Sequence, residues 1–314
     1  MKHITVVTPC FNEEGNVEEL YRQTRAVFDT LPAVRYDHLF IDNCSTDQTV
    51  AILRKLAADN SHVKVILNSR NFGHIRSPYH GLMQADGDAA ILLVADLQDP
   101  PELIRAFIDH WQRGAKIVVG VKPQSEESVA MFAIRRAYYR LVTRIADVKL
   151  IQNFTGFGLY DRQVLDALRR IDDPYPYFRG LVSEVGFDAV QLPYVQPRRK
   201  RGITSNNFYT LYDIAMLGIT SHSRVPLRIC TMAGFALAGI SFFVSLVYLI
   251  LKLLYWDQFS LGTAPLLIGM FFLASVQLFF IGLLGEYVST ILTHVVKRPL
   301  VVERERINMK PELQ

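Results

Sequence analysis

The chain has 314 residues, of which 50% are hydrophobic, and its formal net charge is only +4. This length allows one large domain or two ordinary ones, and the near-neutral charge gives no reason to expect a nucleic-acid partner. The three cysteines, Cys10, Cys44 and Cys230, are odd in number and lack metal-ligand spacing, so we expect reduced structural thiols.

Alternating strands and helices are predicted in the first part of the chain. The expected strands are Ile4–Thr8, His38–Ile41, Val63–Leu67, Ile91–Ala95 and Lys116–Gly120. The helices between them are expected to end near Phe28, at Ala58, near Gln84 and at Gln112, with Ser45 as the N-cap of the second. Such alternation predicts βαβ units on a parallel sheet. The sequence has no GxGxxG after the first strand and no GxxxxGKS/T, which counts against dinucleotide dehydrogenases and P-loop NTPases.

The stretch from Ile91 to Glu102 carries an apolar run into Asp96, which is followed by Gln98, Asp99 and two prolines. The run is typical of a strand buried on both faces, and the prolines suit the first turn of a helix. Asp96 would then lie at the carboxyl end of a central strand, where open α/β sheets bind ligands. In the alternative interpretation, Asp99 caps the helix and Asp96 only starts the turn.

Polar residues also follow the other predicted strands, at Asn12, Asp42 and Asn71. Because the carboxyl ends of parallel strands meet at one edge of a sheet, we expect these side chains and Asp96 on one rim.

The second part of the chain is organised differently. Residues 128–145 are expected to form a helix with an arginine-rich face, and residues 153–162 a glycine-rich segment before a short helix. Residues 206–220 place apolar side chains at helical spacing, which predicts an amphipathic helix in the membrane interface or, alternatively, packed on the soluble domain. Residues 229–251 and 258–285 contain no charge, and each segment exceeds the roughly 20 residues needed to cross a bilayer. We therefore expect two membrane-spanning helices.

Basic residues flank these two apolar segments. They are Arg198, Arg199, Lys200, Arg201, Arg224 and Arg228 before the first, and Lys297, Arg298, Arg304 and Arg306 after the second. The connecting loop holds only Lys252 and Asp257 as charges, so the positive-inside rule predicts that both flanks and the soluble domain are cytoplasmic. The N-terminus has no signal-peptide layout. Glu286, near the end of the second segment, is expected to pair with Arg224 or Arg228.

Several segments in this order resemble glycosyltransferase family 2, the nucleotide-diphospho-sugar transferases with the A-type fold. Residues Thr8–Glu14 resemble its first-strand motif, Asp42–Asp47 resemble D-D-G-S-x-D, and Asp96–Glu102 match D-L-Q-D-P-P-E. Residues 285–287 and 297–299 resemble the C-terminus of the branch that loads a sugar onto a polyprenyl phosphate. The resemblance covers nearly the whole chain.

The resemblance implies a role for particular residues. The nucleotide sugar would be bound by Pro9, Asn12, Glu13, Asp42, Arg70 and Asp96. Asp96 and Gln98 would hold Mg²⁺ or Mn²⁺, which neutralises the leaving diphosphate. Asp99 would approach the sugar, and Arg201 and Ser205 would bind the acceptor phosphate; alternatively, Arg201 only flanks the membrane and contacts lipid head groups. Asp96, Asp99 and Arg201 are thus the candidate catalytic residues.

Three positions depart from the family pattern. Val94 stands where an acid usually precedes the metal ligand, Asn206 stands in place of a lysine, and Gly156 replaces an acid considered to be a base in many relatives. A phosphate monoester has a second pKa near 6, so at neutral pH it is largely ionised and needs no base, whereas an alcohol does. The missing acid at Gly156 therefore favours a lipid-phosphate acceptor.

These observations predict an inverting transferase of the inner (plasma) membrane that moves a sugar from a nucleotide donor, UDP-linked, to undecaprenyl phosphate. We expect a catalytic domain over 1–204, an interfacial helix over 205–225, a membrane hairpin over 226–296 and a cytoplasmic tail over 297–314. By resemblance, its partners would be membrane lipid, further copies of the chain and a small membrane flippase. Two alternatives are transfer to a lipid or glycan hydroxyl, and a non-catalytic membrane partner that only binds nucleotide sugars.

Overall fold

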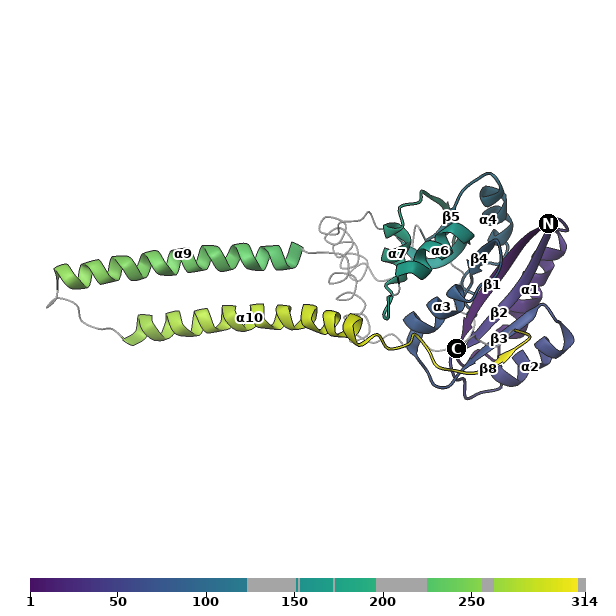
Figure 1. The fold of residues 1–314 in the computed structure, drawn as a ribbon, viewed down its shortest axis with the longest axis horizontal. Coiled ribbons are helices and arrows are strands. Elements are labelled where there is room, and N and C mark those ends of the chain that lie inside the picture. Colours follow the sequence, from purple (N-terminus) through teal and green to yellow (C-terminus); the bar gives the residue numbers. More distant parts are fainter. Residues whose placement is uncertain (123–150, 152, 172, 196–224, 256–262, 310–314) are drawn as a thin grey trace.

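A computed structural model shows an α/β domain from which two long helices extend (Figure 1). It describes residues 1–122, 151, 153–171, 173–195, 225–255 and 263–309. The expected helix over 128–145, the expected interfacial helix over 206–220, and the side chains of Arg201, Ser205 and Arg228 lie outside the described residues.

The centre of the α/β domain is an eight-stranded mixed sheet in the order β7-β5-β6-β4-β1-β2-β3-β8. The strands are β1 (Lys2–Cys10), β2 (Val34–Asp42), β3 (Val63–Asn68), β4 (Ala89–Leu92), β5 (Ile117–Val121), β6 (Phe154–Asp161), β7 (Ala189–Pro193) and β8 (Glu303–Ile307). Strands β4, β1, β2 and β3 are parallel, as are β5 and β7. The predicted parallel sheet is therefore confirmed in its central part, but β6 and β8 pair antiparallel with their neighbours.

Helices cover both faces of this sheet. Helices α1 (Val17–Asp29), α2 (Thr49–Asp59) and α4 (Leu103–Gln112) share one core, and α3 (Gly73–Met83), α6 (Arg162–Ile171) and α7 (Phe178–Glu184) share the other. Successive side chains of a strand point to opposite faces, so Ile4 and Val6 of β1 belong to the first core and Val7 to the second. The result is a three-layer arrangement that leaves the ends of the strands open for loops.

Two strand ends differ from the sequence prediction. Strand β1 does not stop at Pro9 but continues to Cys10 beside β2. Its pairing with β4 ends at Val7, so the missing N–H of Pro9 interrupts no ladder on that side. Strand β4 ends at Leu92 rather than Ala95, because the chain bends away after the Leu93 N–H donates to the Val7 carbonyl at 2.9 Å.

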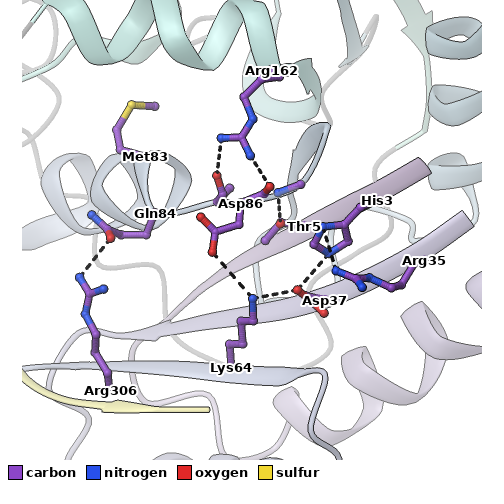
Figure 2. A network of polar contacts seen from close by, with 12 residues as sticks. His3, Thr5, Arg35, Asp37, Lys64, Met83, Gln84, Asp86, Arg162 and Arg306 are labelled. Carbon is purple, nitrogen blue, oxygen red and sulfur yellow. Dashed lines mark hydrogen bonds and ion pairs between the residues drawn. The ribbon is translucent and has the colours of Figure 1, made fainter. Parts of the chain in front are cut away.

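A network of charged side chains lies at the amino ends of the parallel strands (Figure 2). Asp37 accepts from Lys64 at 2.8 Å and contacts His3 at 2.9 Å, and the Arg35 guanidinium lies 3.5 Å from the other ring nitrogen of His3. Arg162 donates to the carbonyl oxygens of residues 85 and 86. Each of these charges meets a partner from another element, so the network fixes the register of β1, β2 and β3.

The two long helices follow the α/β domain in sequence. They are α9 (Val225–Leu254) and α10 (Thr263–Val296). Within the described residues, one stretch is long and apolar enough to cross a membrane, Phe272–Val296 in α10, and α9 holds a shorter apolar stretch, Ile229–Val244. The expected spans over 229–251 and 258–285 are thus supported only in part, and the stretch in α10 lies nearer the C-terminus than predicted.

Strand β8 returns the chain from α10 to the α/β domain. It pairs antiparallel with β3, and Arg54 of α2 forms an ion pair with Glu305 at 2.5 Å. Glu303 contacts His80 of α3 at 2.6 Å and also pairs with Arg306. The sequence predicts a cytoplasmic tail over 297–314, but part of this segment is the edge strand of the sheet and anchors the end of α10 to it.

Candidate active site

The carboxyl ends of β4, β1, β2 and β3 form one rim of the sheet. Strand β1 lies between β4 and β2, so the strand order reverses beside it, and such a switch point is where open α/β sheets bind ligands. Asp42 ends β2 on this rim, and the loops after β1, β3 and β4 hold Asn12, Asn71 and Asp96. The prediction that polar residues gather on one edge of the sheet is confirmed.

Asn12 joins the loop after β1 to the loop after β2. Its φ of 55° is left-handed, its Oδ1 accepts from the Thr46 N–H at 2.8 Å, and its own N–H donates to Ser45 Oγ at 2.9 Å. The Ser45 hydroxyl in turn donates to Asp42 Oδ1 at 2.5 Å. The prediction that Ser45 caps the next helix is therefore wrong, because α2 begins only at Thr49 and the hydroxyl is bound to Asp42.

Asp42 ends β2 and is fully buried. Burial raises the pKa of its carboxyl, and the two hydrogen bonds from Ser45 oppose that rise by stabilising the charged form. The side chain is thus held in one orientation on the rim beside β1, and its role in accepting hydrogen bonds from a nucleotide stays a prediction. Glu13 supports the same loops, because its N–H donates to Thr49 Oγ1 at 2.9 Å and its Oε2 accepts from Asn16 at 2.6 Å.

Asparagine side chains connect the loops after β2 and β3. Asn43 Nδ2 donates to Asn71 Oδ1 at 2.8 Å, and Asn43 Oδ1 accepts from the Phe72 N–H at 2.9 Å and from Asn68 Nδ2 at 3.2 Å. Asn43 and Asn68 were not predicted as site residues, although the repeated asparagines after successive strands were a usable signal. Arg70 lies on this rim, with its guanidinium carbon 4.0 Å from the ring centroid of Phe72.

Asp96 starts the turn that follows β4. Its Oδ1 accepts from the Gln98 N–H at 3.1 Å, and Leu97 between them has a left-handed φ of 58°. The interpretation that Asp96 begins a turn is therefore correct; the contact is with the Gln98 backbone, and a metal-ligand role for Asp96 and Gln98 stays a prediction.

Asp99 does not cap the following helix. Helix α4 begins at Leu103 without a side-chain cap, and Asp99 instead accepts a hydrogen bond from the Tyr194 hydroxyl and lies 3.6 Å from Lys122 Nζ. Burial raises the pKa of Asp99; Lys122 and Tyr194 oppose the rise, and the charge of Asp96 adds to it. Asp99 and Asp96 are thus electrostatic neighbours. Lys122 and Tyr194 were not predicted, because they come from distant, unremarkable sequence.

Asp96 and Gln98 are oxygen donors of the kind that Mg²⁺ and Mn²⁺ prefer. Among the described residues, no group of three or more histidines, cysteines or acids is placed to hold a metal ion. Mg²⁺ retains waters and is held in many enzymes by one or two carboxylates together with substrate phosphates. The donor set at Asp96 fits a cation of that kind, bound mainly through a diphosphate.

Gly156 explains one departure from the family pattern. Its φ of 111° is unfavourable for any other residue, and a Cβ there would lie 3.3 Å from Leu92 Cδ2. The Tyr160 hydroxyl donates to its carbonyl at 2.6 Å, which fixes this backbone. An acid at position 156 would thus require a different course of β6, and this chain supplies no base from that position.

An open α/β sheet with carboxylates and amides on its switch-point rim is the arrangement that the sequence predicts for a nucleotide-sugar transferase of the A-type fold. The chain matches Glycosyl transferase family 2 over residues 5–169 and the GtrB C-terminal hairpin over residues 225–291. It belongs to family 2 and is a glycosyltransferase.

Curated relatives match over almost their whole length. The SfII prophage-derived bactoprenol glucosyl transferase of Shigella flexneri is 34% identical over 297 residues, covering 94% of this chain and 96% of that protein. An uncharacterized glycosyltransferase of Bacillus subtilis, YkcC, is 33% identical over 304 residues, covering 96% of this chain and 94% of that protein. The prophage bactoprenol glucosyl transferase homolog of Escherichia coli is 32% identical over 297 residues, covering 94% of this chain and 96% of that protein. The match therefore includes the C-terminal hairpin as well as the catalytic domain.

Proposed function

We propose that this glycosyltransferase moves a sugar from a UDP-linked donor to a polyprenyl phosphate, namely undecaprenyl phosphate. The observation that carries the proposal is the full-length similarity, hairpin included, to proteins named as bactoprenol glucosyl transferases. A phosphate oxygen of the acceptor attacks the anomeric carbon from the face opposite the leaving group. The bond from that carbon to the nucleotide diphosphate breaks, the diphosphate leaves with the electron pair, and the anomeric configuration inverts.

The donor is assigned to the rim between β1 and β2. Asp42 at the end of β2, held by Ser45, would accept hydrogen bonds from the uracil or the ribose. Pro9, Asn12 and Glu13 would shape the loop beside it. Arg70, on the next loop, would contribute a guanidinium to a phosphate, because its fork of donors matches phosphate oxygens.

Asp96 and Gln98 would hold Mg²⁺ or Mn²⁺ together with the diphosphate. The cation, when bound, neutralises charge that develops on the leaving group. Asp99 would face the sugar only if its hydrogen bond with Tyr194 rearranges or is shared, so we assign it to orienting the sugar pocket with Tyr194 and Lys122. Arg201 and Ser205 remain candidates for the acceptor phosphate.

The acceptor assignment is supported by the absence of an acid at Gly156. A hydroxyl acceptor must lose a proton during attack, whereas an ionised phosphate does not. The glycine backbone at this position leaves no room for the acid without strain. A phosphate acceptor is therefore the better chemical match for this site.

The helices would bring the acceptor to the rim. We propose that α9 and α10 both span the inner membrane, as a hairpin over 226–296, with the catalytic domain on the cytoplasmic side and the segment over 205–225 in the interface. The apolar stretch Phe272–Val296, none of whose residues is buried, supports this placement for α10. Homo-oligomers and a flippase partner stay open to experiment.

The test is a transfer assay with purified full-length protein in detergent, undecaprenyl phosphate and Mn²⁺. Radiolabelled nucleotide sugars are screened one at a time for label that enters the organic phase. We expect one donor to be active, with activity lost on adding EDTA and in Asp96→Ala. Donor binding without any label in the organic phase would contradict the proposal and favour a hydroxyl acceptor or a non-catalytic role.

A further inference from the structure

Three arginines converge near the end of α10. This arginine cluster consists of Arg70 from the loop after β3, Arg76 from α3 and Arg298, which follows α10 by two residues. The guanidinium carbons of Arg70 and Arg76 lie 4.0 and 5.4 Å from the ring centroid of Phe72. Arg76 also donates to the carbonyl of Pro299, directly after Arg298. Residues far apart in sequence therefore place three positive charges together.

The arginine cluster lacks the acids that accompany other cations of the domain. Several other arginines and lysines of the α/β domain are paired with an acid. These ion pairs are Arg22–Glu19, Arg54–Glu305, Lys64–Asp37, Lys116–Asp161, Lys122–Asp99, Arg169–Asp166 and Arg306–Glu303. No carboxylate of the described residues forms an ion pair with Arg70, Arg76 or Arg298. The buried Nε of Arg76 also finds no acceptor among the described residues. Burial lowers the pKa of Arg76, Arg70 and Arg298 lower it further, and Tyr175 opposes the shift.

Three positive charges held close together repel one another, and this repulsion is relieved when an anion binds between them. Guanidinium groups match phosphate oxygens with paired hydrogen bonds, which makes phosphate the best fit among common anions. A cavity of about 390 Å³ opens beside the cluster; of the three arginines Arg298 lines it, together with Lys297 and Pro299, whose carbonyl accepts from Arg76. Its one lining acid, Asp173, lies 3.5 Å from His294. The space is large enough for a head group and carries a net positive lining.

The position of the cluster identifies where the phosphate comes from. Arg298 lies two residues beyond Val296, the last residue of the apolar stretch that would cross the membrane. Basic side chains at that level meet the phosphates of the membrane surface. We propose that Arg76 and Arg298 bind a lipid-borne phosphate at the membrane surface, with Arg70 adding to the local positive charge.

This proposal rests on the proposed membrane placement of α10. The phosphate belongs either to an acidic phospholipid or to the polyprenyl acceptor on its way to the rim. In both cases the bound lipid would hold α3, and with it the loop that carries Arg70, against the membrane. The two sources differ in the rest of the lipid, so they can be separated by experiment.

The experiment is native mass spectrometry of the full-length protein in detergent, titrated separately with phosphatidylglycerol, undecaprenyl phosphate and phosphatidylcholine. Arg298→Gln changes an exposed side chain and is the first variant, with Arg76→Gln as the second. The matched control is Arg113→Gln, which removes an exposed charge after α4. We expect each cluster variant to weaken binding of a phosphate lipid on the order of fivefold, and the control to bind as wild type.

The pattern of loss identifies the source. Weaker binding of both anionic lipids indicates an acidic phospholipid site, and weaker binding of undecaprenyl phosphate alone indicates a route for the acceptor. Unchanged binding of both lipids in Arg298→Gln and Arg76→Gln would overturn the proposal. Because binding is measured without a donor, normal lipid binding by a protein that transfers no sugar would count against the proposed function and leave the lipid site standing.

Discussion

The two ends of the central sheet hold their polar side chains in different ways. At the amino ends, charges meet opposite charges, as Asp37 meets Lys64 and His3 (Figure 2). At the carboxyl ends, amides and hydroxyls such as Asn12, Asn43 and Ser45 hold the loops. The amino ends thus use ion pairs to fix the strands. At the carboxyl rim, acids such as Asp42 and Asp96 accept hydrogen bonds from hydroxyl and backbone N–H groups, which orient the carboxylates there.

The largest expected effect is on turnover at the carboxyl rim. Asp96→Asn keeps the shape of the turn but removes a charge assigned to the cation and the diphosphate. We expect turnover to fall by about 10²–10³-fold, as when a group that stabilises developing charge is removed. The melting temperature should stay within about 2 °C of wild type, measured by thermal unfolding in detergent.

The matched control for this change is Asp88→Asn at the amino ends of the strands, where Asp88 accepts from the His3 N–H at 2.9 Å. It should retain turnover. A similar loss of turnover in both variants would mean that the two ends of the sheet do not differ as described.

The next effect is on stability at the amino ends. Asp37→Asn removes the charge that faces Lys64 and His3. Among the described residues, Lys64 then keeps one acidic partner, Asp86 at 4.0 Å, and stays partly buried. We expect a loss of about 2–3 kcal/mol in the free energy of unfolding, with the turnover of folded protein unchanged. Chemical denaturation combined with activity per folded molecule measures both quantities. A fall in turnover without a fall in stability would contradict this assignment.

A smaller loss of stability is expected from Gly156→Ala. The alanine would have to adopt a φ of 111°, and its Cβ would lie 3.3 Å from Leu92 Cδ2. Strain of this kind costs about 1–2 kcal/mol. The control is Gly114→Ala, because Gly114 also has a positive φ but has open space around it. Comparing the thermal unfolding of the two variants separates the effect of the Leu92 contact from the effect of backbone strain. Equal losses in the two variants would show that the contact with Leu92 adds nothing.

The smallest effect concerns the edge strand and depends on pH. Burial alone would raise the pKa of Glu303, but hydrogen bonds from His80 and Arg306 lower it to about 2. The folded pKa is below the unfolded value, so Glu303 stabilises the protein above the unfolded pKa, near 4.3, and this contribution is lost as pH falls towards 2. The Glu303 side chain is mostly buried, with 11% of it exposed, and the cost of desolvation offsets much of the gain from its two partners, so the contribution is about 1 kcal/mol. Glu303→Gln should therefore show a shallower loss of melting temperature between pH 5 and 3 than wild type.

Local pattern was enough to predict the parallel core of the fold and its rim. The apolar run before Asp96 and the turn residues after each strand are consequences of burial and backbone geometry that a sequence carries directly. This is why Asn12, Asp42 and Asp96 were found. The role of Ser45 was missed because a hydroxyl after a strand can cap a helix or bind the nearest carboxylate, and only the fold decides between them.

Contacts between distant segments could not be predicted in this way. Strand β8 is short and highly charged, and it reaches β3 only after the whole hairpin has intervened. Likewise, Asp99 meets Tyr194 and Lys122 from other elements, and the arginine cluster forms only when α10 delivers Arg298 to α3. In each case tertiary packing decides which residues meet, and such contacts produce no regular spacing in the sequence from which they could be predicted.

The central claim is that the acceptor is an ionised lipid phosphate that needs no protein base. It is tested most directly by comparing undecaprenyl phosphate with undecaprenol as acceptors for the full-length protein, with the active donor, across pH 5 to 8. We expect transfer only to the phosphate, at a rate that rises near pH 6, the second pKa of a phosphate monoester, and is level above it. Transfer to undecaprenol at a comparable rate would contradict the account.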